Sequence, residues 1–157
     1  FLIYQFIRHR YENVDIVFLS HDTAAYEVNE KQFFTRGSGG GTIVSSALKQ
    51  ALDIINERYH PHSWNVYCFQ CSDGDNWPDD TSSCNEAAHA LKDVSQLYCY
   101  CEIEPERDRI KWLEDRDSRL SNAFAGFVDK SFKIVKIFTK EDIWPAFKKI
   151  FGGKINE

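Results

Sequence analysis

Residues 36–80 decide the fold of this chain and read RGSGGGTIVSSALKQALDIINERYHPHSWNVYCFQCSDGDNWPDD. They combine a Gly-rich loop, a helix, a strand and an acidic loop. Apolar residues at positions 43, 44, 47, 48, 51, 52 and 55 predict one apolar stripe on a helix that begins at Thr42. Residues 64–71 are largely aromatic and β-branched, which is typical of a buried strand, and Ser72-Asp73-Gly74 follows. A helix N-terminus and a strand C-terminus that both carry oxygen ligands are what an open α/β sheet uses to build a binding crevice.

The composition indicates a globular protein with a single domain over residues 1–157. Hydrophobic residues make up 43% of the chain and charged residues 27%, so a disordered chain is excluded. The net charge is −5 and no basic stripe is present, which argues against a nucleic-acid partner. No apolar run approaches the roughly 20 residues that span a bilayer, so we expect no membrane partner. Because the chain starts at Phe1 rather than Met, we expect it to be a fragment of a longer protein.

Five cysteines occur, at positions 68, 71, 84, 99 and 101. An odd number, with four of them in predicted strands, indicates reduced thiols and a cytoplasmic protein. Cys68 and Cys71 resemble half a zinc site, but residues three apart in a strand point to opposite faces, so they cannot chelate one ion unless the strand breaks. Cys99 and Cys101 share a face. We interpret the cysteines as structural core residues.

The rest of the chain alternates helical and strand patterns. Pro145 is expected to lie too deep for the first turn of the last helix and to bend or restart that helix. The run at 14–20 is almost entirely apolar, which predicts a parallel strand covered on both faces. The predicted helices cover residues 1–11, 29–34, 42–59, 79–94, 104–124 and 139–152, and the predicted strands cover residues 14–20, 25–28, 64–71, 96–103 and 132–138, with 25–28 at an edge.

This order predicts an α/β fold with a mostly parallel sheet and helices on both faces. Right-handed crossovers then bring the loops after residues 20, 71 and 103 to one edge of the sheet. Asp73 directly follows a buried strand, and Thr42 offers a hydroxyl at a helix N-terminus facing the same edge. A hydroxyl and a carboxylate suit Mg²⁺ or Mn²⁺ rather than zinc. The alternative is that Thr42 is an N-cap and Ser72-Asp73-Gly74 a simple turn.

Two motifs together resemble a known family. Gly40-Gly41-Thr42, followed by a helix, looks like the second motif of von Willebrand factor A domains, and Ser72-Asp73-Gly74 looks like their third. The resemblance implies a Rossmann-like sheet in which Thr42 and Asp73 help form a metal-ion-dependent adhesion site. A carboxylate from a partner protein takes the open position of that metal. The family's first motif, Asp-x-Ser-x-Ser at the end of a central strand, is absent, so we expect that strand to lie outside this chain.

A second resemblance covers most of the chain. The segments 21–34, 39–80 and 143–151 look like the bacterial YeaH/YhbH family of unknown function. Members are often encoded beside a serine protein kinase, which associates the resemblance with kinase-linked signalling or a stress response. It implies a protein partner, with that kinase system as one candidate.

Several further residues are expected to line the binding edge. They are His21, Gly40, Gly41, Ser72 and Asp75. His21 lies at a strand end, where an imidazole can support a metal site or accept a proton. No Ser/His/Asp or Cys/His catalytic set can be assembled, so a binding module is favoured over an enzyme. The alternatives are a metal-dependent hydrolase or phosphotransfer enzyme that uses the same edge, and a metal-free scaffold.

Overall fold

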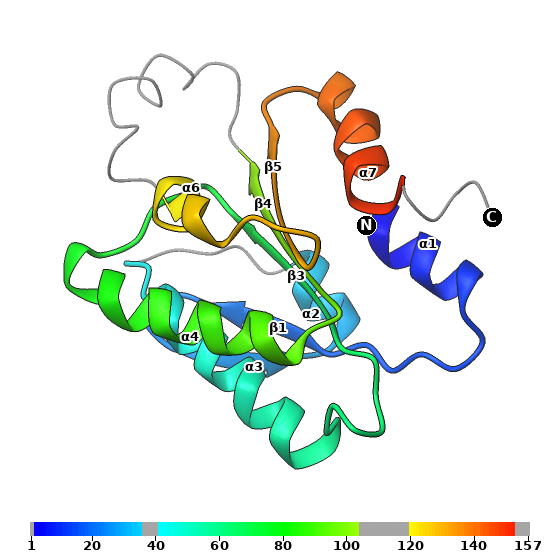
Figure 1. Ribbon diagram of the computed structural model, residues 1–157, viewed down its shortest axis with the longest axis horizontal. Helices are drawn as coiled ribbons and strands as arrows, with labels where there is room; N and C mark the ends of the chain where they lie inside the picture. Colours follow the sequence, from blue (N-terminus) through cyan, green and yellow to red (C-terminus); the bar gives the residue numbers. More distant parts are fainter. Residues whose placement is uncertain (1, 36–40, 104–119, 153–157) are drawn as a thin grey trace.

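The computed structural model of the protein describes residues 2–35, 41–103 and 120–152 (Figure 1). The helices are α1 (Leu2–Arg10), α2 (Glu30–Thr35), α3 (Val44–Arg58), α4 (Thr81–Val94), α6 (Leu120–Ala123) and α7 (Ile143–Phe151), with short 3₁₀ turns η1 (Pro78–Asp80), η4 (Ala125–Phe127) and η5 (Lys140–Asp142). The strands are β1 (Phe18–His21), β2 (Ala25–Val28), β3 (Tyr67–Ser72), β4 (Leu97–Ile103) and β5 (Phe132–Ile137). The expected helix over 104–124 falls mostly outside the described residues.

Strands β3, β4 and β5 form a parallel sheet with β4 in the centre. Tyr67 lies opposite Leu97, and Tyr98 lies opposite Phe132. Parallel neighbours need a long crossover, and α4 provides the one between β3 and β4. A mixed α/β fold with a parallel sheet flanked by helices is therefore confirmed for these three strands.

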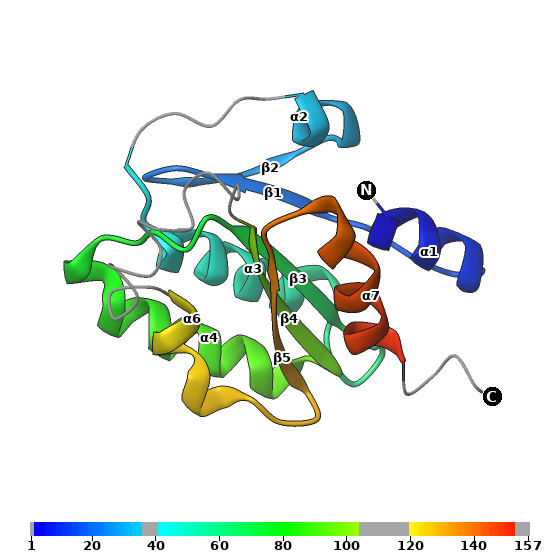
Figure 2. The same ribbon diagram turned by 90° about the horizontal axis from the view of Figure 1, so that it is seen from above.

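Helices cover both faces of this sheet (Figures 1 and 2). On one face, Tyr98 and Tyr100 of β4 join a core with α3, α4 and α6. On the other face, Cys99 and Cys101 join a core with α7, and α1 packs against it. The first six residues of β4 are all buried, because alternate side chains enter the two cores.

The expectation of a parallel strand at 14–20 is wrong. β1 covers only Phe18–His21 and pairs antiparallel with β2 in a separate two-stranded sheet. The chain reverses directly after His21, where the Asp22 carboxylate accepts a hydrogen bond from the backbone N–H of Ala24 at 3.1 Å. This Asx-type turn returns the chain alongside β1. β1 is half-buried rather than covered on both faces, whereas β2 and α2 agree with expectation.

The expectation that Pro145 lies too deep for the first turn of the last helix is also wrong. Pro145 is only the third residue of α7 and so lies in its first turn, where the missing N–H has no helical acceptor. The helix does restart, because η5 precedes α7. The Asp142 carboxylate accepts the backbone N–H of Thr139 at 2.9 Å, which completes a capping box.

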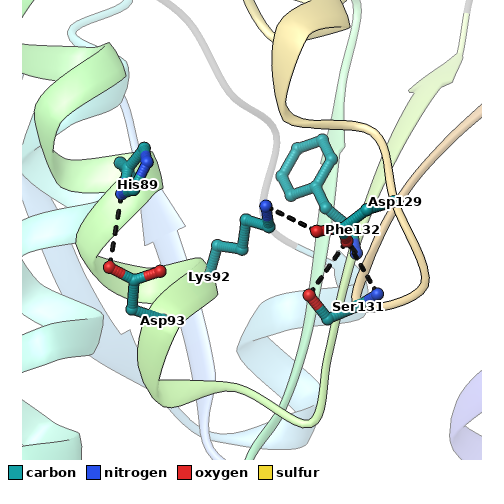
Figure 3. Close-up of polar contacts among 6 residues, drawn as sticks. All are labelled: His89, Lys92, Asp93, Asp129, Ser131 and Phe132. Carbon is teal, nitrogen blue, oxygen red and sulfur yellow. Dashed lines mark hydrogen bonds and ion pairs between the residues drawn. The ribbon is translucent and has the colours of Figure 1, made fainter.

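A polar contact fixes the turn before β5 (Figure 3). Lys92, near the end of α4, pairs with Asp129 at 2.7 Å. Asp129 also accepts the backbone N–H groups of Ser131 and Phe132, each at 2.8 Å. One carboxylate therefore anchors the start of β5 to α4. Among the described helices, none is long and apolar enough to cross a membrane.

Candidate functional site

Two segments of the predicted binding edge lie against each other. The backbone N–H of Trp77 donates to the carbonyl oxygen of Thr42 at 3.3 Å. The backbone N–H of Ile43 donates to the carbonyl oxygen of Asp22 at 2.9 Å. The loops after β1 and β3 therefore both meet the N-terminus of α3. We call residues 21–24, 41–45 and 72–80 together the rim.

Side chains from the loop after β3 cap α3. The backbone N–H of Val44 donates to Asn76 Oδ1 at 3.1 Å, and that of Ser45 donates to Asp80 Oδ2 at 2.9 Å. Amide groups in the first turn of a helix have no helical acceptor, and the dipole there favours a carboxylate. Asp80 is buried, so it acts here as a structural cap and not as a solvated loop acid.

Thr42 lies one residue before the N-cap of α3. The helix begins at Val44 and its N-cap is Ile43, without a side-chain cap bond. The interpretation of Thr42 as a simple N-cap is therefore wrong. Its role as a metal ligand stays a prediction.

A tight contact explains Gly41. A Cβ atom added there would lie 2.6 Å from a ring carbon of Trp77, so only glycine lets the indole approach this closely. Gly41 thus belongs to the rim through packing against the loop after β3. Gly40, the other predicted glycine, lies outside the described residues.

The Ser72–Asp75 segment forms a turn with bonds of its own. Ser72 Oγ accepts the backbone N–H of Gly74 at 3.0 Å, and Asp73 Oδ1 accepts that of Asp75 at 3.3 Å. Gly74 has a φ of 97°, which L side chains rarely adopt. Asp73 and Asp75 are exposed at the rim. The turn interpretation of this segment is confirmed, and a ligand role for Asp73 stays a prediction beside it.

His21 stands at the end of β1 within reach of the Asp73 charge. Burial lowers the pKa of its imidazole below the usual value, and the weaker attractions of Asp22 and Asp73 oppose this shift. The ring is therefore neutral at pH 7. Among the described residues, neither the buried Nδ1 of His21 nor the buried Nδ2 of Asn76 has a hydrogen-bond partner.

A buried polar chain on β4 was not anticipated from the sequence. Tyr100 Oη donates to Glu102 Oε2 at 3.2 Å, and Glu102 is only 2% exposed. Glu102 also lies 3.6 Å from Lys136 Nζ of β5. Burial raises the pKa of the Tyr100 hydroxyl well above its usual range, and the Glu102 charge adds to this shift. The signal in the sequence is one acid, Glu102, in an otherwise uncharged strand.

The described residues offer the rim oxygen ligands but no complete metal site. No group of three or more His, Cys, Asp or Glu side chains within the described ranges could hold a metal ion. A hydroxyl and a carboxylate alone leave most of the six positions of Mg²⁺ to water or to other segments.

Comparisons with known proteins identify relatives of this chain. A family described as "Protein of unknown function (DUF444)" matches residues 1–154. A UPF0229 protein of Ruminiclostridium cellulolyticum is 47% identical over 151 residues, which cover 96% of this chain and 36% of the relative. A UPF0229 protein of Pseudomonas paraeruginosa is 42% identical over 157 residues, covering 98% and 35%. One from Yersinia pestis is 42% identical over 151 residues, covering 96% and 34%.

The chain thus spans about a third of the length of these relatives. No solved structure matches it. The expectation of a bacterial family of unknown function is confirmed, whereas the finer resemblance to von Willebrand A domains stays a prediction.

Proposed function

This chain belongs to the DUF444 family, with bacterial UPF0229 proteins of unknown function as its relatives, and we propose that it is a protein-binding module of the von Willebrand A type. In this proposal Thr42 and Asp73 hold Mg²⁺ or Mn²⁺, directly or through water, and a carboxylate of a partner protein takes an open position of the ion. The observation that supports this proposal most is that the loop after β3 is hydrogen-bonded to the start of α3, through Trp77 and Asn76.

The chemistry of the rim suits a hard cation. Thr42 and Asp73 offer oxygen ligands, and Asp73 is exposed. The neutral His21 does not repel a positive ion. Buried polar groups in folded proteins are nearly always hydrogen-bonded. Nδ1 of His21 and Nδ2 of Asn76 have no partner in the part of the chain that the structure describes, which favours a further polar group at the rim. Water around an ion, or the partner's carboxylate, would satisfy the Asn76 amide.

We propose that the remaining ligands come from a strand that precedes residue 1 in the parent protein. In the described part of the chain, β1 pairs only with β2 and β3 pairs only with β4, so each keeps one open edge. Helix α3 packs against β1 and β2 and also contributes to the core under β4. A strand between β1 and β3 would close both edges and end at the rim.

Mn²⁺ binding by the full-length protein, measured by calorimetry, tests this function. Asp73→Asn should weaken Mn²⁺ binding by at least about tenfold, because the variant loses a charged ligand. Asp93→Asn is the control, since Asp93 is an exposed acid on α4 outside the rim, and it should leave the affinity within about twofold.

Equal affinity of the wild type and Asp73→Asn would contradict the metal site. A full-length protein that binds no Mn²⁺ would contradict the metal site and favour the alternative of a metal-free scaffold. The serine protein kinase system as partner, and the hydrolase or phosphotransfer alternative, stay predictions.

A further inference from the structure

Cys71 of β3 and Cys101 of β4 lie directly opposite each other in the parallel sheet. Neighbouring strands lie about 4.8 Å apart, which is inside the Cα separation of about 4.4–6.8 Å that a disulfide spans. Phe69, two residues before Cys71 on β3, packs in the same core as Cys101, so both thiols lie on the same face of the sheet. The two thiols therefore face each other across neighbouring strands, within the range that a disulfide can span.

The two thiols differ in their access to solvent. Cys71 is exposed, whereas Cys101 is only 5% exposed and packs in the core beneath α7. A small oxidant from solvent therefore reaches Cys71 first, and Cys101 lies beside it to complete the reaction.

The other three cysteines lack this arrangement. Cys68 lies opposite Tyr98, and Cys99 lies opposite Phe69. Cys84 is fully buried on α4. Burial raises the pKa of all three thiols to about 12, which keeps them protonated and unreactive at neutral pH.

We propose that Cys71 and Cys101 are a peroxide-oxidised thiol pair that closes reversibly to a disulfide. The Cys71 sulfur gives up its proton and attacks one oxygen of hydrogen peroxide. The O–O bond breaks, one water leaves, and Cys71 becomes a sulfenic acid. The Cys101 sulfur then attacks the Cys71 sulfur, the S–O bond breaks, and a second water carries away the Cys101 proton. Two thiols lose two electrons and two protons, and one peroxide becomes two waters.

The disulfide would join β3 to β4 immediately before Ser72 and Asp73. It does not depend on the metal site, because neither thiol has a role in the proposed ion binding. Reduction by a dithiol would restore the pair.

Peptide mass mapping of the full-length protein, after treatment with equimolar hydrogen peroxide and alkylation in denaturant, tests this inference. We expect a Cys71–Cys101 linked peptide that dithiothreitol removes. The variant Cys101→Ser should instead trap a sulfenic acid at Cys71, detected as a dimedone adduct. Cys99→Ser, which removes the next thiol on the same face, should leave the linked peptide unchanged.

The wild-type peptides decide the matter even if a variant fails to fold. Oxidation of Cys68, Cys84 or Cys99 before Cys71 would overturn the inference. A linked peptide that joins Cys71 to any cysteine other than Cys101 would also overturn it.

Discussion

At the scale of single residues, the carboxylate of Asp129 makes several polar contacts at once. Its carboxylate accepts backbone N–H groups of Ser131 and Phe132 and pairs with Lys92 (Figure 3). The ammonium group of Lys92, followed by the N–H of Phe132, lowers the pKa of this carboxyl well below its ordinary value of 3.8. An exposed side chain therefore holds the entry to β5 through hydrogen bonds to its charged form.

The pH dependence of stability follows from the direction of this shift. Because the pKa of Asp129 is lowered by folding, its contribution is complete above the ordinary value of 3.8 and is lost as the pH falls toward the folded pKa. Asp129→Asn should therefore lower the urea midpoint at pH 7, and the difference from wild type should shrink below pH 4. Urea unfolding followed by circular dichroism at both pH values measures this.

Asp93→Asn is the matched control for Asp129. Asp93 lies on α4 close to Lys92 and contacts only the exposed His89, at 3.3 Å, among the contacts of Figure 3. Exposed ion pairs contribute little, so this variant should unfold like the wild type. An equal loss in both variants would mean that the Asp129 hydrogen bonds have no special effect.

At the scale of elements, the start of α3 depends on the side chain of Asp80, which follows β3. Asp80 is 9% exposed and accepts the backbone N–H of Ser45 at 2.9 Å. Asp80→Ala should lower the free energy of unfolding by about 1–2 kcal/mol, the range for losing a helix cap. Its neighbour Asp79 is exposed, so Asp79→Ala should change that energy by less than about 0.5 kcal/mol. Denaturant titrations of the two variants would contradict this role if Asp79→Ala lost as much as Asp80→Ala.

The same elements show which structural features can be predicted from sequence. Helical spacing identified α3 to within two residues at each end, and the aromatic run identified β3, because these signals lie within each element. The pairing of β1 was missed because an apolar run does not distinguish a buried parallel strand from one side of a hairpin. The Asx turn at Asp22 was the local signal that could have corrected it.

The site was less predictable than the fold. Thr42 and Asp73 follow from motifs, and the segments that carry them do lie together at the rim. The caps from Asn76 and Asp80 join residues more than 30 positions apart, and no sequence spacing encodes such contacts. Buried Glu102 depends on partners in β4 and β5 for the same reason.

At the scale of the whole molecule, the fold consists of a hairpin and a parallel sheet that share α3 but have no strand pairing between them in the described residues (Figure 2). The open edge of β3 carries backbone N–H and C=O groups along six residues. Such edges pair readily with strands of other chains, and proteins normally cover or charge them. Neither β1 nor β3 is charged, since they read FLSH and YCFQCS.

The chain of residues 1–157 on its own should therefore self-associate and bind Mn²⁺ poorly. Pairing between copies would satisfy the β3 edge, and apolar surface around that edge would add about 25 cal/mol per Å² buried. The full-length protein, in which we propose that a preceding strand occupies this edge, should be less prone to associate and should bind Mn²⁺ more tightly. Light scattering after size-exclusion chromatography compares the two directly. A monomeric chain of 157 residues that unfolds cooperatively would mean that β1 and β3 need no further strand, and the proposed origin of the missing metal ligands would fall with it.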